Sequence, residues 1–162
     1  MHPHNTHRRA LAVSRDAAGR LIDGLGSRPD PLWPGEQWPP MRFDRPLQAG
    51  AEGGHGPIRY RVEAYEPGRS VRFVFTGPRG LAGTHEFSLE DAPGGCILRH
   101  TIAGHTSGRM LLAWPLVYRP LHDALLEDAL DKAELALTGK VARPSRWSCW
   151  VRLLRRAARR SG

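Results

Sequence analysis

Three histidines stand where they could transfer protons inside a folded core. His85 and His100 each occupy the apolar side of an alternating segment, and His122 lies midway along the apolar side of a helical segment. Imidazole is the side chain best suited to proton transfer near neutral pH, and it also binds metals. Burial would lower the pKa of each ring and keep it neutral, as a general base or a ligand requires. The alternative stays open that a buried imidazole bonds a backbone carbonyl or a tyrosine and is structural.

The spacing of these histidines does not favour a metal site. None of the three belongs to an HxH or HExxH motif, and no carboxylate is expected to point inward beside them. The two cysteines, Cys96 and Cys149, form no CxxC pair and no disulfide framework, which indicates a reducing compartment. We therefore predict no metal and no other cofactor.

Alternating segments between residues 58 and 105 predict the sheet that would position two of these histidines. The segments 58–66, 71–77, 84–91 and 96–105 alternate apolar and polar residues, and Pro/Gly turns separate them. This pattern is typical of an antiparallel meander with one dry and one wet face. On the dry face we expect Ile58, Tyr60, Val62, Ala64, Val71, Phe73, Phe75, His85, Phe87, Leu89, Leu98, His100 and Ile102.

A long amphipathic helix follows the predicted strands. Residues 108–138 change to a helical period, and the strong helix should begin near Pro120 and end at Gly139. Its apolar side would carry His122, Leu125, Leu126, Ala129, Leu130, Ala133, Ala136 and Leu137, and the opposite side would carry an acidic stripe of Asp123, Glu127, Asp131 and Glu134.

The first third of the chain predicts smaller elements. Residues 6–13 could form a short strand, and Ser14 opens a short helix that ends at Gly24. Residues 27–40, with their prolines and two tryptophans, predict an irregular connection. We expect residues 53–57, which read GGHGP, to form a loop, with His55 as a weaker candidate at a cavity mouth.

This order of elements predicts an α+β domain, a curved antiparallel sheet wrapped around a long C-terminal helix. Over residues 6–138 the chain resembles the START-like superfamily of helix-grip proteins, which includes polyketide cyclases and lipid-transfer domains. The resemblance rests on the block GGHGPIRYRVEAYEPGRSVRFVFTGPRGLAGTHEFSLED, on ILRH and on RPLHDALLEDAL. It implies a hollow between sheet and helix. It implies no particular reaction, because the superfamily shares no catalytic motif that can be carried over.

The expected function is therefore to bind a small hydrophobic or amphipathic molecule or lipid in that hollow, with its transport as an open extension of this role. Its walls would be Tyr60, Phe73, Phe75, Phe87, Leu98, Trp114, Tyr118, Leu125 and Leu126. The alternative is an enzyme of the polyketide cyclase/dehydratase kind, in which His122 moves protons with help from His85 or His100.

The last segment, residues 140–162, carries the whole net charge of +8. Projected as a helix over residues 145–160, it places Trp and Leu on one side and Arg on the other, as in helices that lie in a membrane interface. A disordered extension is the next alternative, and nucleic-acid binding is disfavoured because no groove-reading motif accompanies the basic residues. The expected contacts with an anionic membrane are Trp147, Trp150, Leu154, Arg152, Arg155, Arg156 and Arg159.

We thus expect a START-like ligand-binding domain over residues 1–139 and a basic amphipathic tail over residues 140–162. No apolar leader and no run of about 20 apolar residues is found in the sequence. A cytoplasmic protein, or one peripheral at the inner face of the membrane, is the resulting expectation.

Overall fold

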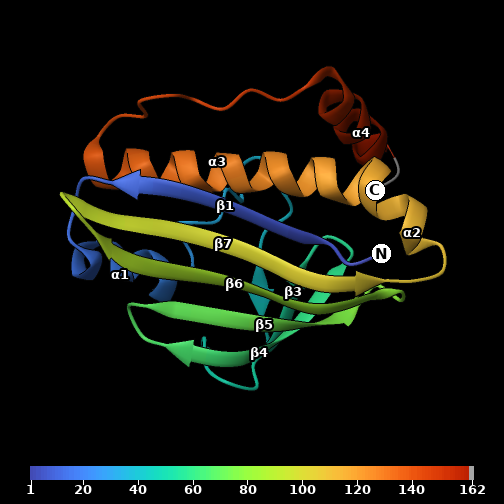
Figure 1. Ribbon diagram of the computed structural model, residues 1–162, viewed down its shortest axis with the longest axis horizontal. Coiled ribbons are helices and arrows are strands. Elements are labelled where there is room, and N and C mark those ends of the chain that lie inside the picture. Colours follow the sequence, from blue (N-terminus) through green and yellow to red (C-terminus); the bar gives the residue numbers. More distant parts are fainter. Residues whose placement is uncertain (161–162) are drawn as a thin grey trace.

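The structure is a computed structural model that describes residues 1–160, without the side chains of residues 159 and 160. One seven-stranded antiparallel sheet has the strand order β1-β7-β6-β5-β4-β3-β2 (Figure 1). Its strands are β1 (His4–Leu11), β2 (Arg42–Phe43), β3 (Glu52–His55), β4 (Ile58–Glu66), β5 (Ser70–Gly77), β6 (Leu81–Ala92) and β7 (Gly95–Thr106). The first strand, β1, pairs with β7 and so extends the β2–β7 meander at that edge of the sheet.

Capping residues, proline and glycine set the ends of the helices. In α1 (Arg15–Asp23), the amide of Ala17 donates to the Ser14 hydroxyl, which caps the first turn. The long helix α3 (Arg119–Thr138) begins beside Pro120 and ends at Gly139, which has φ +74°. Before it come α2 (Met110–Ala113) and a π-helical segment, η1 (Trp114–Tyr118), and the tail forms α4 (Cys149–Arg160).

The curved sheet and α3 enclose the core, with α1 beneath one end (Figure 1). Apolar residues of β4–β7 face Leu125, Leu126, Ala129 and Leu130 of α3. Trp33 and Trp38, from the proline-rich connection, are buried in the same cluster. The predicted fold is confirmed.

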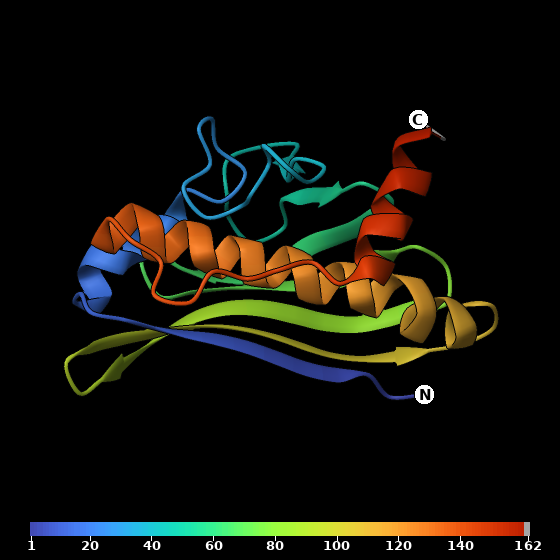
Figure 2. The ribbon, with the colours of Figure 1, turned by 90° about the horizontal axis from the view of Figure 1, so that it is seen from above.

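The segment 139–148 runs back along α3 and delivers α4 to the end of the domain where α2 lies (Figures 1 and 2). Carboxylates of α3 hold it there. Glu134 accepts from the amide of Ala142 at 3.0 Å, and Asp131 accepts from the amide of Ser145 at 2.7 Å. The tail is therefore packed on the domain along its length up to α4.

Three local expectations were wrong. Residues 52–55 form strand β3 where a loop was expected. Gly53 allows the close approach of β2, because a Cβ atom at this position would lie only 2.2 Å from the carbonyl oxygen of Arg42. Ala64 is exposed, because a register irregularity between Val62 and Ala64 turns it to the other face.

At the C-terminal end of α3 the two sides exchange their expected environments. Ala136 is exposed and Glu134 is buried. The returning segment covers the acidic side of the helix there, where the amide of Ala142 donates to Glu134. Within residues 1–160, no helix is both long enough and apolar enough to cross a bilayer.

Candidate functional site

A cavity of about 310 Å³ lies between the sheet and α3. Its walls are largely apolar, and they come from β3–β7, η1, α3, α4 and the proline-rich connection. The polar exceptions include four histidines, His55, His85, His100 and His122. Sites for small molecules in proteins have this character, an apolar hollow with a few placed polar groups.

The three predicted histidines do converge on this cavity. Nδ1 of His85 lies 3.3 Å from Nε2 of His100, across the β6–β7 pair. The rings of His100 and His122 have centroids 5.1 Å apart, so strand and helix contribute to one cluster. His55, from β3, joins them from the other wall, where its Nδ1 lies 3.2 Å from the Tyr60 hydroxyl.

Burial keeps these rings neutral. It holds the pKa of both His85 and His100 well below the usual range, because no carboxylate offsets the loss of solvent. Burial also lowers the pKa of His122, and it lowers the pKa of His55 to about 3. All four imidazoles are therefore neutral at pH 7, and each can donate one hydrogen bond and accept another.

The contact between His85 and His100 fixes what the pair offers to a ligand. Each neutral ring carries one proton, and one ring must donate to the other. If Nδ1 of His85 donates, its Nε2 is an acceptor and Nδ1 of His100 is a donor; in the opposite tautomers these roles exchange. These two outer nitrogens, and Nε2 of His122, are buried without a hydrogen-bond partner among the described residues. Such atoms are costly to bury alone, and a ligand with hydroxyl or carbonyl groups would satisfy them.

The opposite side of α3 carries a polar network that the sequence did not reveal. His7 of β1 lies 2.8 Å from Glu127 and 3.2 Å from Asp123, and Arg9 lies 2.8 Å from Asp131. Burial works against protonation of His7, but the hydrogen bonds to both carboxylates raise its pKa. Burial would likewise raise the pKa of Asp123, and its bonds to His122 and His7 lower it. The acidic stripe thus binds β1.

One group within residues 1–160 has ligand atoms close enough to hold a metal ion. Atoms of His7, His122 and Asp123 lie within 4.8 Å of one another. The hydrogen bonds of His7 to Asp123 and Glu127 account for this arrangement, so no step below is assigned to a metal.

Comparison with solved structures places this geometry in a known fold. The chain aligns over 86% of its length with the whole of Ara h 8.0201, at a TM-score of 0.64 and 12% identity. The same share of it aligns with 51% of StfQ, a di-domain ARO/CYC protein of the steffimycin biosynthetic pathway, at a TM-score of 0.65 and 12% identity. This chain has a START-like fold.

A third START-like neighbour is a norcoclaurine synthase of Thalictrum flavum, solved in complex with a transition-state analogue. It matches 86% of this chain and 96% of its own, with a TM-score of 0.61 and 15% identity. At such identities the likeness shows the fold alone. No family model and no curated protein matches the sequence.

The START-like cavity uses only part of the predicted wall. Phe75, Trp114, Tyr118, Leu125 and Leu126 line it, as do the three predicted histidines. Four other predicted wall residues do not line it and lie buried in the solid core, namely Tyr60, Phe73, Phe87 and Leu98. Alternation reports which face of a sheet is dry, but it cannot report how far the hollow extends along that face.

The tail residues divide in a way that helical projection did not anticipate. Trp147 packs against Trp38 and donates to Asp128 at 2.8 Å, and the Arg155 guanidinium lies 4.3 Å above the Trp38 ring. These two side chains face the domain, which differs from the expectation that they meet lipid. Trp150, Arg152 and Arg156 are exposed, Leu154 is half-buried, and the side chain of Arg159 lies outside the described residues.

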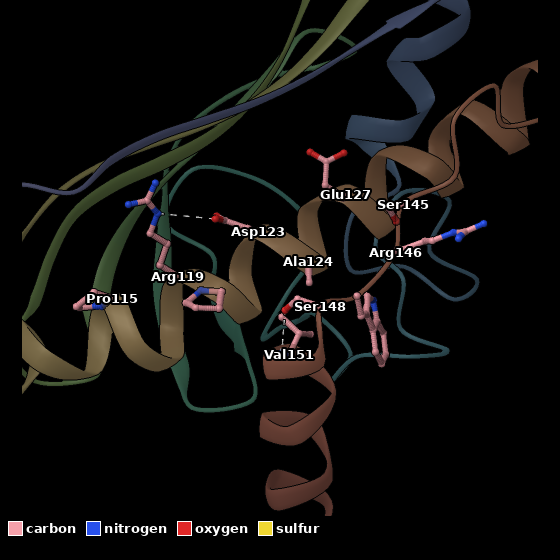
Figure 3. A pocket seen from close by; sticks show the side chains of 11 residues that line it. Pro115, Arg119, Asp123, Ala124, Glu127, Ser145, Arg146, Ser148 and Val151 are labelled. Carbon is pink, nitrogen blue, oxygen red and sulfur yellow. Dashed lines mark hydrogen bonds and ion pairs between the residues drawn. The ribbon is translucent and has the colours of Figure 1, made fainter.

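A larger groove of about 730 Å³ lies between α3 and residues 145–151 (Figure 3). Figure 3 shows Arg119 directed at Asp123 and Arg146 pointing away from α3. The walls of this groove carry both basic and acidic side chains and are open to solvent. The enclosed apolar cavity is therefore the better site for a hydrophobic molecule.

Proposed function

We propose that the protein binds a small hydrophobic or amphipathic molecule in the cavity between its sheet and α3, and that it carries this molecule. The observation that carries the proposal is the combination of an apolar cavity with three buried imidazole nitrogens that lack partners among the described residues. The fitting ligand has an apolar body and a hydroxyl or carbonyl group that reaches His85, His100 or His122.

Filling the cavity tests this proposal. Leu121→Trp places a larger ring at a cavity-lining position of α3, and Leu137→Trp makes the same change on the same helix away from the cavity. With 1-anilinonaphthalene-8-sulfonate as the probe, Leu121→Trp should weaken binding about tenfold, or about 1.4 kcal/mol. Equal affinities of the two folded variants would reject the cavity as the site. Native mass spectrometry of freshly purified protein identifies any ligand that it retains.

An enzymatic role is the second candidate, and the paired rings of His85 and His100 favour it. A pair with one donor end and one acceptor end can take a proton from carbon and return one to a carbonyl oxygen. The shared proton then shifts between the rings, and neither ring becomes charged. A reaction of the polyketide cyclase/dehydratase kind needs such enolisation of a poly-carbonyl chain, and His122 stands beside the pair.

Deuterium exchange at the central carbon of benzoylacetone, followed by NMR, measures this activity directly. His100→Phe and His122→Ala should abolish protein-catalysed exchange while binding of the diketone persists. Exchange at the wild-type rate in both variants would leave the histidines with a binding role.

We also propose that the tail holds the protein reversibly on an anionic membrane, at the inner face of the membrane that encloses the cytoplasm. Arg152 and Arg156 are exposed on α4, and each basic residue near an anionic surface contributes about 1 kcal/mol. The double variant Arg152→Glu, Arg156→Glu should lose sedimentation with phosphatidylserine vesicles. The matched pair Arg61→Glu, Arg79→Glu, exposed on other parts of the domain, should not.

A further inference from the structure

Exposed apolar side chains gather at one end of the molecule. Seven large apolar residues within residues 1–160 are exposed, and five of them belong to α2, η1 and α4. Leu112 is 71% exposed and Leu116 is 56% exposed, although both belong to a segment that also supplies the buried Met110 and Trp114. The five are Leu111, Leu112, Leu116, Trp150 and Leu153.

These residues form one surface because α4 packs beside η1. The indole nitrogen of Trp150 donates to the Leu116 carbonyl oxygen at 2.7 Å, which joins segments 34 residues apart in sequence. Both views place α2 and α4 at the same end of the domain (Figures 1 and 2). We call the five residues the α2–α4 surface.

Three faces of α4 explain the arrangement. Val151 and Arg155, spaced i, i+4, point to the domain, where Val151 is buried and Arg155 covers Trp38. Trp150 and Leu153 occupy the next face and stay exposed. The arginines at 152 and 156 form the third face, so the apolar side predicted from sequence divides between the domain and solvent.

Arginines border the α2–α4 surface, and acidic residues are missing from its segments. Arg109 and Arg119 flank α2 and η1, and no Asp or Glu occurs between them. Arg152 and Arg156 lie on α4, in a tail that also contains no acidic residue. The charge therefore complements an anionic partner.

The cavity opens beside this surface. Most lining residues are buried or half-buried, but Pro39, Gly56, Pro57 and Ala158 are both lining and exposed, which locates the opening between α4, the proline-rich connection and the β3–β4 turn. Trp114 and Tyr118 of η1 line the interior. The helices that carry the α2–α4 surface thus also form part of the cavity wall.

We propose that the α2–α4 surface inserts into an anionic bilayer and so brings the cavity opening to the lipid, from which the ligand is exchanged. This rests on the proposed membrane association and deepens it, because leucines of α2 and η1, absent from the tail, make the contact. Leu and Trp with a border of Arg suit the headgroup boundary of a membrane.

Two other occupants fit less well. A second copy of the chain would bring arginines against arginines with no acidic partner on either surface. A nucleic acid would pair with the arginines through its phosphates but would leave the clustered leucines in water, so it would not account for the apolar part of the surface.

The test uses the full-length protein and vesicles of phosphatidylcholine with and without phosphatidylserine. Leu112→Glu and Leu116→Glu should each lower the partition coefficient on the anionic vesicles at least about tenfold. Leu135→Glu is the matched control, because Leu135 is 52% exposed on α3 and lies outside the α2–α4 surface; it should bind as the wild type does.

Each outcome assigns the contact. If Leu112→Glu and Leu116→Glu bind like the wild type while Trp150→Glu releases the protein, the tail alone docks, and the proposal is wrong while membrane association stands. If the wild-type protein binds neither kind of vesicle, both the proposed membrane association and this proposal are wrong. If size-exclusion chromatography shows a wild-type dimer that Leu112→Glu converts to a monomer, and vesicles bind neither, the partner is a second copy.

Discussion

Two histidines whose pKa values shift in opposite directions lie only a few ångströms apart, one on each side of helix α3. The rings of His7 and His122 have centroids 5.7 Å apart, and both contact Asp123. Yet the carboxylates of Asp123 and Glu127 raise the pKa of His7, whereas burial lowers the pKa of His122. Two acidic partners outweigh burial at His7, whereas the single acidic partner of His122 does not offset its burial.

The difference also separates two tasks of one helix. On the β1 side, α3 uses charge to hold the first strand and the returning tail. On the cavity side it presents apolar groups and neutral rings, where charge would repel a hydrophobic ligand. A helix with an acidic stripe can therefore border a dry cavity without charging it.

The largest expected effect is acid destabilisation that arises on the cavity side. Unfolding exposes His85 and His100, whose pKa then rises to 6.5, so the unfolded chain binds protons that the folded chain does not. Below pH 6.5 the two rings should together lower the unfolding free energy by about 3 kcal/mol per pH unit. Urea denaturation at several pH values measures this slope.

A single substitution sharpens that prediction. His100→Leu should reduce the acid slope by about half. Near pH 7.5, which is above the unfolded pKa, it should cost about 1–3 kcal/mol, because it removes one buried nitrogen that lacks a partner but also takes from Nδ1 of His85 the partner that it has. An unchanged acid slope would mean that His100 is charged or solvated in the folded protein.

The next effect concerns the polar side. Arg9 bonds Asp131 and Glu134, and all three side chains are mostly buried. Arg9→Met would leave both carboxylates without a cationic partner, and we expect a loss of about 2–3 kcal/mol, somewhat below that of a fully buried pair. Arg8→Met, one residue earlier and exposed, is the control and should cost less than about 0.5 kcal/mol. Similar losses in the two variants would show that β1 is not held by this network.

The smallest effect should appear above neutral pH. His7 has a raised pKa, so its stabilisation is complete below 6.5 and is lost as the pH rises through its folded pKa. His7→Gln should therefore abolish this decline on the alkaline limb and leave the acid slope unchanged. NMR titration of the His7 ring locates the pKa; a value below that of a free histidine would reverse the comparison.

Much of the candidate site follows from local geometry. Alternation places His85 and His100 on the same side as Phe87 and Leu98, and the helical period places His122 beside Leu125. These periods belong to the backbone, so each segment reveals its own buried side without its partners. The irregular connection and the end of α3 at Gly139 are equally local, because they depend on proline and glycine.

The tertiary structure decided what covers each side. The pKa of His7 is raised because β1 meets Asp123 and Glu127, which lie more than 100 residues later in the chain, and no local pattern records that pairing. Trp147 and Arg155 belong to an amphipathic segment that suits lipid equally well, yet they pack on Trp38. An apolar face in a sequence shows that water is to be excluded from it. Only the folded chain determines whether a sheet, a neighbouring loop, a cavity or an outside surface excludes that water, because those contacts join residues far apart in sequence.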